Sequence, residues 1–247
     1  MIAELVQIGR VISPWKLPED VPIGGAPARI EIEPVFEPAL ENIERASHLV
    51  VIAHMHLADR SAMKSSSRKL GCAARECGVF GTRSPSRPNP LSMTVVELVS
   101  RDGLVLIVDP LDLVNGTVVL DIKGYSPGWD NAHCAKLERR VDVAGLSSEY
   151  LELMLRRSMR NHLGSYGGSS RATATLRALV QAVRFLGVDP RDERLCMEVA
   201  ACDIVLDALM GMTGATFSSG RMSVVQNVGA NSVRFVVGDR QYVSNIE

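Results

Sequence analysis

The sequence feature that most constrains the fold of this 247-residue chain is a segment with prolines at three of its last six positions. It runs from Gly78 to Pro90, with the other two prolines at 85 and 88, and leads into an apolar run, Leu91 to Val99. Each proline fixes its own φ and disfavours helix at the residue before it. The segment must therefore be an extended, rigid loop that leads into a strand.

Two arginines of this segment, Arg83 and Arg87, carry a charge that proteins cannot remove. A guanidinium group on a rigid loop is well suited to hold an anion, because its planar fork makes paired hydrogen bonds to carboxylate or phosphate oxygens. Alternatively, the arginines bond to the carbonyl groups of an irregular connection or lie in water. The residue types alone leave both interpretations open.

Composition places the chain among folded globular proteins, since hydrophobic residues make up 46% and charged residues 22% of it. Its length allows one large domain or two small ones. The formal net charge of -1 gives no global positive field that would attract a polyanion. This counts modestly against an RNA substrate and leaves room for a local basic patch.

Cysteine usage points to a reducing compartment. The five cysteines are an odd number and form no Cys-x-x-Cys pair, and the chain does not start with a charged and then apolar signal sequence. The longest apolar runs, such as Leu104 to Val108, are far too short to cross a bilayer. We therefore expect a cytoplasmic protein with no membrane partner.

The first half of the chain is punctuated into short strands by prolines, glycines and polar turns. Such spacing favours a β-barrel or curled sheet, and no Gly-x-Gly-x-x-Gly motif indicates a Rossmann fold. A short helix, Pro38 to Ala46, is expected among the strands. The predicted strands are Ala3–Ile12, Ala28–Glu33, His48–Ala53, Ser92–Val99, Gly103–Val108 and Val118–Ile122.

The second half changes to helical periodicity, with serines at helix starts and Gly187 at one helix end. We predict an α+β domain and place the two domains at residues 1–138 and 144–247. The predicted helices are Leu146–Leu163, Ser170–Leu186 and Ile204–Met212, followed by strands at Ser223–Val228, Ser232–Val237 and Gln241–Val243.

Two histidines, His54 and His56, follow the buried strand that ends near Ala53. Residues two apart on a strand point the same way, as a metal site would need. No acidic residue or cysteine lies beside them in the sequence, so contact of one histidine with a ligand is the preferred interpretation.

The segment from Arg60 to Arg75 is basic and rich in serine, with no apolar period. A solvated surface loop is the simpler interpretation of such a segment. A loop that contacts phosphate or gates a substrate is the functional alternative.

The segment Gly78–Pro90 resembles the signature of the TrmO-like (TsaA-like) family of S-adenosylmethionine-dependent methyltransferases, with Gly81 in place of an alanine. The resemblance covers about the first half of the chain and implies a small β-barrel that is commonly a homodimer. It extends to other motifs in the same order, namely Ile8-Gly9, Ser13-Pro14, residues 47–49, residues 111–117, residues 120–123 and Tyr125.

The resemblance also implies residues that bind S-adenosylmethionine. The matching positions are Pro22, His56, Leu57, Arg83, Met93, Asn115, Gly116, Thr117 and Val118. An arginine and a glutamine of the family pattern are replaced here by Ile23 and Gly24, which removes hydrogen-bond donors. Asn115 replaces an aspartate, which removes a negative charge near a cationic sulfonium.

Methyl transfer asks the protein to align a nucleophile with the methyl group and to accept a proton. The candidate proton acceptors are His54, Asp121 and Tyr125. Asp121 is two residues before Lys123, and a structural ion pair between them is the preferred interpretation of that pair.

The second half more faintly resembles the FmdE-like domain known from formylmethanofuran dehydrogenase. The family's metal-binding histidine and two cysteine positions match His162, Gly164 and Ala215, so only His162 and Cys202 remain as plausible ligands. We therefore predict no metal site. A zinc ion on His162, Cys196 and Cys202 is the less favoured alternative.

These observations predict an S-adenosylmethionine-dependent methyltransferase. The near-neutral charge favours a small-molecule or other non-tRNA acceptor. One alternative is the family's tRNA activity, N6-methylation of threonylcarbamoyladenosine, and the basic segment from residue 60 favours it. The other is a non-catalytic ligand-binding or scaffold protein, suggested by the changes at Ile23, Gly24 and Asn115.

Overall fold

The structure is a computed structural model that describes residues 4–65, 76–131, 146–201, 203–225 and 231–246. Its contacts divide the chain into two compact units, one of residues 1–69 and 75–132 and the other of residues 70–74 and 133–247. The boundary predicted between residues 138 and 144 lies outside the described residues. Each unit has its own hydrophobic core.

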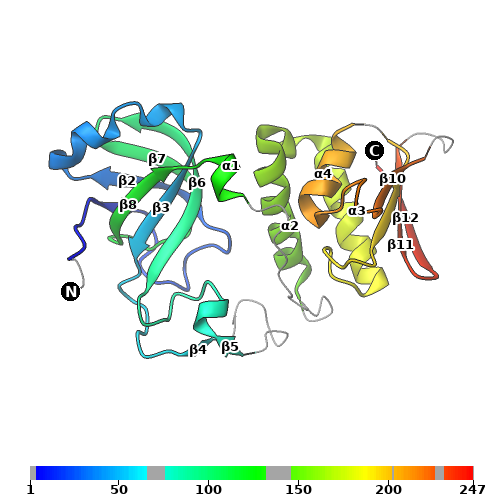
Figure 1. Ribbon diagram of the computed structural model, residues 1–247, viewed down its shortest axis with the longest axis horizontal. Helices are drawn as coiled ribbons and strands as arrows, with labels where there is room; N and C mark the ends of the chain where they lie inside the picture. Colours follow the sequence, from blue (N-terminus) through cyan, green and yellow to red (C-terminus); the bar gives the residue numbers. More distant parts are fainter. Residues whose placement is uncertain (1–3, 66–75, 132–145, 202, 226–230, 247) are drawn as a thin grey trace. The chain divides into compact units, whose positions relative to one another are not determined.

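The first unit is built on a closed barrel of six strands (Figure 1). Neighbours follow the order β1-β2-β7-β6-β3-β8, and every pair is antiparallel. The predicted β-barrel is therefore confirmed. The strands are β1 (Gly9–Ile12), β2 (Ala26–Ile32), β3 (His48–His54), β6 (Leu91–Asp102), β7 (Val105–Leu111) and β8 (Val118–Gly124).

Alternating side chains fill the barrel. In β2, Ala28, Ile30 and Ile32 are buried, whereas Arg29 and Glu31 between them are exposed. This period of two is what a strand with one face in a core requires. The interior also holds Val11, Leu49, Val51, Ala53, Val96, Leu106, Val108, Leu111 and Val119.

The predicted helix at residues 38–46 is wrong. The chain forms two 3-10 helices instead, Pro34–Leu40 and Ile43–Arg45, with Pro38 inside the first. Asn42 between them has a φ of 60°, which no α-helix accommodates. The apolar spacing was therefore real, but the proline and the left-handed residue interrupt the helix.

Smaller elements complete the first unit. A two-stranded sheet joins β4 (Lys64–Ser65) to β5 (Cys77–Gly78), and a 3-10 helix, Val79–Gly81, follows it. The short helix α1 spans Pro127–Asp130. Of the predicted surface loop from residue 60, residues 66–75 lie outside the described part of the chain.

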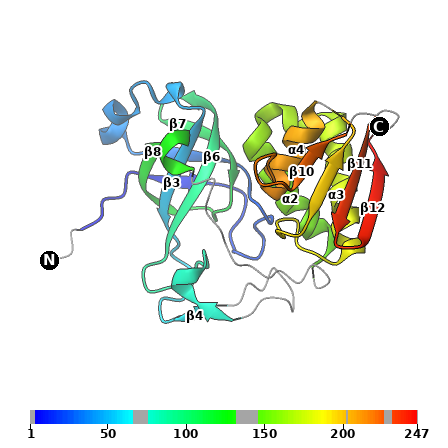
Figure 2. The same cartoon turned by 45° about the vertical axis from the view of Figure 1, so that its right-hand side comes forward.

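The second unit packs helices on one side of a four-stranded mixed sheet of order β10-β9-β11-β12 (Figures 1 and 2). The predicted α+β architecture is confirmed. Helices α3 and α4 lie toward the sheet and α2 packs against both of them. The elements are α2 (Ser148–Leu163), α3 (Ser170–Leu186), β9 (Cys196–Val199), α4 (Ile204–Thr213), β10 (Met222–Val224), β11 (Ser232–Val237) and β12 (Arg240–Asn245).

Helix α3 has the bounds that its sequence predicts. The side chain of Ser169 accepts a hydrogen bond from Ala172 N at 3.2 Å, and Gly187 ends the helix with a φ of 67°. Nine of its residues are buried because the helix lies between the sheet and the other helices. Strand β9 was not predicted, since its four residues are too few to show a clear period.

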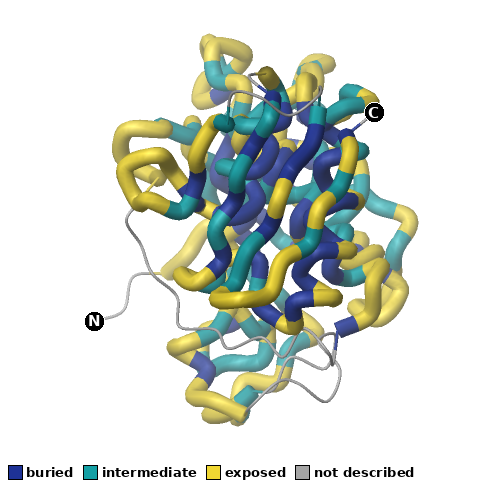
Figure 3. Tube along the Cα trace, turned by 90° about the vertical axis from the view of Figure 1, so that its right-hand side faces the viewer, coloured by how far each residue is buried: buried dark blue, intermediate teal, exposed yellow. Residues whose placement is uncertain are grey.

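The other face of this sheet is more polar. Figure 3 looks toward the sheet and shows buried positions interspersed with intermediate and exposed ones along its strands. On the outer face, Arg234 pairs with Glu198 of the neighbouring strand at 2.9 Å. The sheet therefore uses one face for the core and the other for cross-strand polar pairs.

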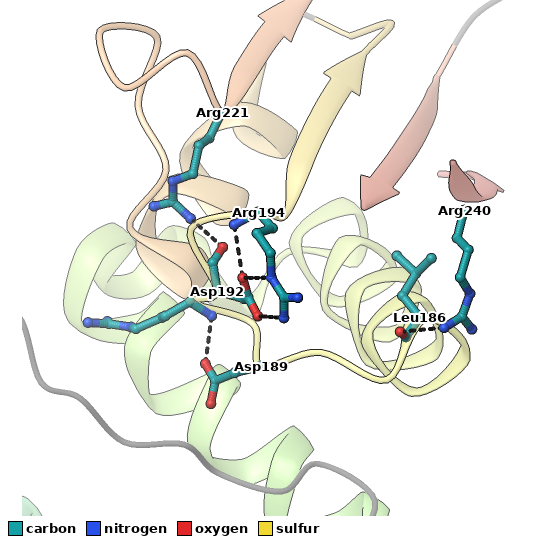
Figure 4. Close-up of polar contacts among 7 residues, drawn as sticks. Leu186, Asp189, Asp192, Arg194, Arg221 and Arg240 are labelled. Carbon is teal, nitrogen blue, oxygen red and sulfur yellow. Dashed lines mark hydrogen bonds and ion pairs between the residues drawn. The ribbon is translucent and has the colours of Figure 1, made fainter. Parts of the chain in front are cut away.

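A polar network orders the loop between α3 and β9 (Figure 4). The Asp192 carboxylate accepts two hydrogen bonds from the Arg194 guanidinium, at 3.0 and 2.6 Å, and one from the Arg194 backbone N–H at 2.9 Å. Arg221 donates to the Asp192 carbonyl at 3.1 Å. The bonds from Arg194 lower the pKa of Asp192. Burial raises the pKa of Asp189, although the backbone N–H of Arg191 opposes that rise.

Among the described helices, none combines the length and the hydropathy that a membrane crossing requires.

Candidate functional site

Strand register brings the predicted cofactor-binding segments to one end of the barrel. His54, the last residue of β3, lies opposite both Leu91 and Val118, the first residues of β6 and β8. At the same end, Ala26 begins β2 opposite Leu111, where β7 finishes. We call this the loop end of the barrel. All of the residues predicted to bind the cofactor lie at the loop end, either on a connecting loop or within three residues of a strand terminus. They are Pro22, His56, Leu57, Arg83, Met93 and residues 115–118.

Arg87 determines the shape of the proline-rich loop. Its Nε donates to Ser84 O at 2.8 Å, and its Nη2 donates to the carbonyls of Val79 and Thr82. The bond to Val79 measures 2.9 Å. Of the two interpretations of the loop arginines, the carbonyl-bonding one therefore applies to Arg87.

Arg83 differs from Arg87 in both exposure and partners. Its side chain is exposed and makes one long hydrogen bond, Nη1 to Met93 O at 3.4 Å. Within the described residues it has no ion pair. Most of its five donors thus remain available for an anionic group.

Backbone bonds tie this loop to the chain that follows β3. Met55 N donates to Pro90 O at 2.8 Å, and Arg60 Nε donates to Pro88 O at 3.1 Å. The loop is therefore fixed against the segment that carries His56 and Leu57. That segment is exposed, with Leu57 retaining 51% of its accessible surface.

Polar groups of the segment 115–118 form hydrogen bonds with other residues of the protein. Asn115 Oδ1 accepts a hydrogen bond from Ser13 N at 3.1 Å, and Thr117 Oγ1 donates to Val114 O at 2.8 Å. Gly116 has a φ of 78° and donates its N–H to Val11 O. An asparagine oxygen accepts the Ser13 bond as an aspartate would, so this replacement removes a charge without loosening the loop.

The two lost donors fall in a tight turn. Gly25 N donates to Pro22 O at 2.9 Å, and Gly24 between them has a φ of 92°. Ile23 is 40% exposed. The side chains at these positions thus offer apolar surface and no hydrogen bonds.

The three candidate proton acceptors are not brought together. His54 is half-buried at the loop end. Asp121 pairs with Lys123 at 2.5 Å, which confirms the expected ion pair. Tyr125 follows the far end of β8, where its N–H donates to His48 O at 2.9 Å, so the length of β8 separates it from the loop end by about 20 Å.

Comparison with known proteins gives this barrel a family. The profile of the tRNA-methyltransferase O N-terminal domain matches residues 10–131. A probable S-adenosyl-L-methionine-binding protein of Pyrococcus abyssi is 39% identical over 142 residues, which cover 54% of this chain and 76% of that protein. The chain belongs to the TrmO N-terminal domain family.

Two other relatives differ in how much of the chain they match. A probable S-adenosyl-L-methionine-binding protein of Archaeoglobus fulgidus is 33% identical over 246 residues, which cover 96% of this chain and 64% of that protein. The chain therefore spans less than two thirds of that relative. The tRNA (adenine(37)-N6)-methyltransferase of Escherichia coli is 36% identical over 134 residues, covering 49% of this chain and 57% of that protein.

Residues at the loop end of this TrmO-family barrel fit S-adenosylmethionine. Arg83 has donors available for the cofactor's carboxylate, and Leu57 and Met93 expose apolar surface on which a planar base can pack. Sequence reasoning missed Trp15, whose Nε1 is buried without a partner among the described residues. Its carbonyl accepts Asn115 N at 2.6 Å, so it lies at the loop end.

A buried indole N–H usually finds an acceptor, so the unpartnered Nε1 of Trp15 is an exception at the loop end. The sequence signal for it was the placement of one of only two tryptophans directly after Ser13-Pro14 at a strand end.

The TrmO family profile ends at residue 131, so the FmdE-like resemblance of the second unit stays a prediction. His162 lies on the last turn of α2 and packs tightly on α4, where a Cβ added to Gly211 would be 2.6 Å from the Cβ of His162. Cys196 lies in β9, Gly164 follows α2, Ala215 is buried and Cys202 is outside the described residues. The described part of the chain holds no cluster of three metal-ligating side chains.

Proposed function

We propose that the chain is an S-adenosylmethionine-dependent methyltransferase whose cofactor binds at the loop end of the barrel. The observation that carries this proposal is the convergence of four separated segments, 13–25, 54–57, 83–93 and 112–118, at that end. Relatives named as S-adenosyl-L-methionine-binding proteins support the choice of cofactor. Loops held by a rigid scaffold are the usual place for such a site.

When bound, S-adenosylmethionine supplies a methyl group on a cationic sulfur, which the acceptor's nucleophilic atom takes as it loses a proton. Arg83 would pair with the cofactor's carboxylate through its available donors. His54 accepts the proton, because it ends β3 at the loop end, whereas Asp121 is paired with Lys123 and Tyr125 lies at the far end of β8. Alignment by the rigid loops provides the rest of the rate enhancement.

The acceptor is proposed to be a small molecule or another non-tRNA substrate. The net charge of -1 supports this choice, because binding a nucleic acid relies on many cationic contacts. Methylation of tRNA is the second candidate, favoured by the name of the Escherichia coli relative. Strong inhibition of methyl transfer by added salt would favour the tRNA acceptor over the small molecule.

A non-catalytic binding protein is the third candidate. It is favoured by relatives that are named only for binding the cofactor and by the replacements at Ile23, Gly24 and Asn115. A protein of this kind would bind S-adenosylmethionine and transfer no methyl group to any nucleophile supplied.

Calorimetric titration with S-adenosylmethionine tests the proposed site. We expect Arg83→Ala to weaken binding at least about tenfold, as the loss of a charge-assisted hydrogen bond predicts. Arg45→Ala is the matched control, since Arg45 precedes β3 at the opposite end of the barrel and is also exposed. Equal weakening by both variants would contradict the placement at the loop end, and no binding by the unmodified protein would contradict the cofactor itself.

A further inference from the structure

The outer surface of the barrel carries a groove that none of the predicted cofactor residues lines. Its volume is about 530 Å³, within the range of small-molecule sites. Strand register forms its floor, because Arg29 of β2 lies opposite Ile12 of β1 on one side and Ile107 of β7 on the other. The groove is also lined by Ser13, Pro14 and Pro27, and its lining is largely apolar.

Arg29 is the one charged residue that lines the groove. In the part of the chain that the structure describes, its side chain has no hydrogen bond or ion pair. Of the carboxylates on the same face, Glu31 pairs with Arg10 at 4.0 Å. Asp109, two residues beyond Ile107, has a partner of its own. The groove thus combines apolar walls with an uncompensated guanidinium.

The groove adjoins the proposed cofactor site through Ser13. This residue lines the groove, and its N–H donates to Asn115 Oδ1 at 3.1 Å while its Oγ donates to Leu113 O at 3.3 Å. A ligand in the groove would therefore lie beside the segment 115–118. This is the position that a methyl acceptor requires, next to the cofactor and not on it.

We propose that this groove is the acceptor subsite and that it takes a small molecule with an apolar body and a carboxylate. The carboxylate pairs with Arg29, whose planar fork matches its two oxygens, and the body packs on Ile12 or Ile107 beside it. A single cation flanked by apolar walls suits such a ligand better than a nucleic acid backbone. The inference rests on the proposed methyltransferase function.

Calorimetric titrations of the full chain with octanoate and with uncharged octanamide test the groove. We expect octanoate to bind at least about tenfold more tightly than octanamide, because the guanidinium forms an ion pair only with the charged ligand. Arg29→Gln should remove this preference by weakening octanoate binding far more than octanamide binding. The control Arg45→Gln should keep the preference, and the heat-unfolding midpoint should confirm that both variants fold.

Titration with S-adenosylmethionine distinguishes the acceptor subsite from the cofactor site. Arg29→Gln should bind S-adenosylmethionine as the unmodified protein does, and saturating S-adenosylmethionine should change the octanoate dissociation constant at least about threefold, since neighbouring sites are coupled reciprocally. Loss of S-adenosylmethionine binding in Arg29→Gln, or no coupling, would overturn the acceptor assignment.

The two proposals fail in different ways. Suppose that Arg29→Gln leaves octanoate binding unchanged and that Arg83→Ala weakens S-adenosylmethionine binding. This result overturns only the groove inference. Absence of S-adenosylmethionine binding overturns the proposed function and with it the acceptor role, even if octanoate binding depends on Arg29.

Discussion

At the scale of single residues, the two arginines of the proline-rich loop have different roles. Arg87 donates to three backbone carbonyls and holds the loop, whereas Arg83 has one long bond and remains exposed. Nothing in the residue types separates them, because the carbonyls that Arg87 reaches are brought together only by the folded loop. The site therefore depends on one arginine for shape and on the other for binding.

A glycine in the turn before β2 permits the close approach of two strands. Gly25 has a φ of 84°, and a Cβ there would be 2.8 Å from the carbonyl carbon of Leu111. Gly25→Ala should lower the free energy of unfolding by about 3 kcal/mol, from backbone strain and the clash together. Urea unfolding followed by tryptophan fluorescence measures this loss.

Gly81→Ala is the matched control for that substitution. A Cβ at Gly81 would meet no atom within 4 Å, so stability should stay the same or rise by about 0.5 kcal/mol. Equal losses in the two variants would show that Gly25 is not specially constrained.

Two carboxylates of the loop between α3 and β9 should change the free energy of unfolding in opposite directions as the pH rises. Burial raises the pKa of Asp189, so its stabilising contribution is present at low pH and is lost as the pH rises through that pKa. Asp189→Asn should therefore raise the free energy of unfolding at neutral pH, since the amide oxygen still accepts the Arg191 N–H. The gain should disappear in acid, below the ordinary carboxyl pKa.

Asp192→Asn should lower the free energy of unfolding at neutral pH. Hydrogen bonds from Arg194 lower the pKa of Asp192, so its contribution is present at neutral pH and is lost as the pH falls through that lowered pKa. The variant should cost about 1 kcal/mol at neutral pH and nothing in strong acid. Urea unfolding of both variants, followed by circular dichroism across this pH range, checks the signs; a common sign would contradict the electrostatic account.

At the scale of elements, the sequence predicted a helix correctly where local residues set both of its ends. Helix α3 was predicted to the residue because Ser169 and Gly187 act locally. The helix expected at residues 38–46 failed because Pro38 and Asn42 break it. The position of Tyr125 far from the loop end was not predicted, because it depends on the length and register of β8 and not on any local signal.

The end of α3 depends on a residue from β12. Arg240 donates to Leu186 O at 3.0 Å (Figure 4). It also donates to Phe185 O, and its guanidinium lies over the Phe185 ring at 5.8 Å. Arg240→Ala should lower the free energy of unfolding by about 2 kcal/mol, because two terminal carbonyls lose their donors. Thermal unfolding followed by circular dichroism measures it. Arg177→Ala, an exposed site on the same helix, should change stability by no more than about 0.5 kcal/mol.

At the scale of the whole molecule, the two units carry different spectroscopic signals. Both tryptophans, Trp15 and Trp129, belong to the first unit, whereas the described helices of ten residues or more, α2, α3 and α4, belong to the second. Tryptophan fluorescence therefore follows the barrel, and helical circular dichroism follows the second unit.

This division gives a test of where S-adenosylmethionine acts. At one hundred times its dissociation constant the cofactor should stabilise the barrel by about 2.7 kcal/mol, which raises the fluorescence midpoint by about 10 °C. The midpoint seen by circular dichroism should not move, and Arg83→Ala should abolish the fluorescence shift. Equal shifts of both signals would mean that the cofactor stabilises the two units together.

The barrel and the four-stranded sheet also differ in whether their edge strands are paired. The barrel closes on itself, whereas the described sheet of the second unit ends at β10 and β12, which pair on one side only. Open strand edges are where partly unfolded chains join one another, and a short or polar edge strand slows this. β10 has only three residues and β12 begins with Arg240 and Gln241. Resistance of this protein to aggregation in storage should therefore depend on the shortness of β10 and the polar start of β12, and these two strands are the place to add charge when a longer shelf life is wanted.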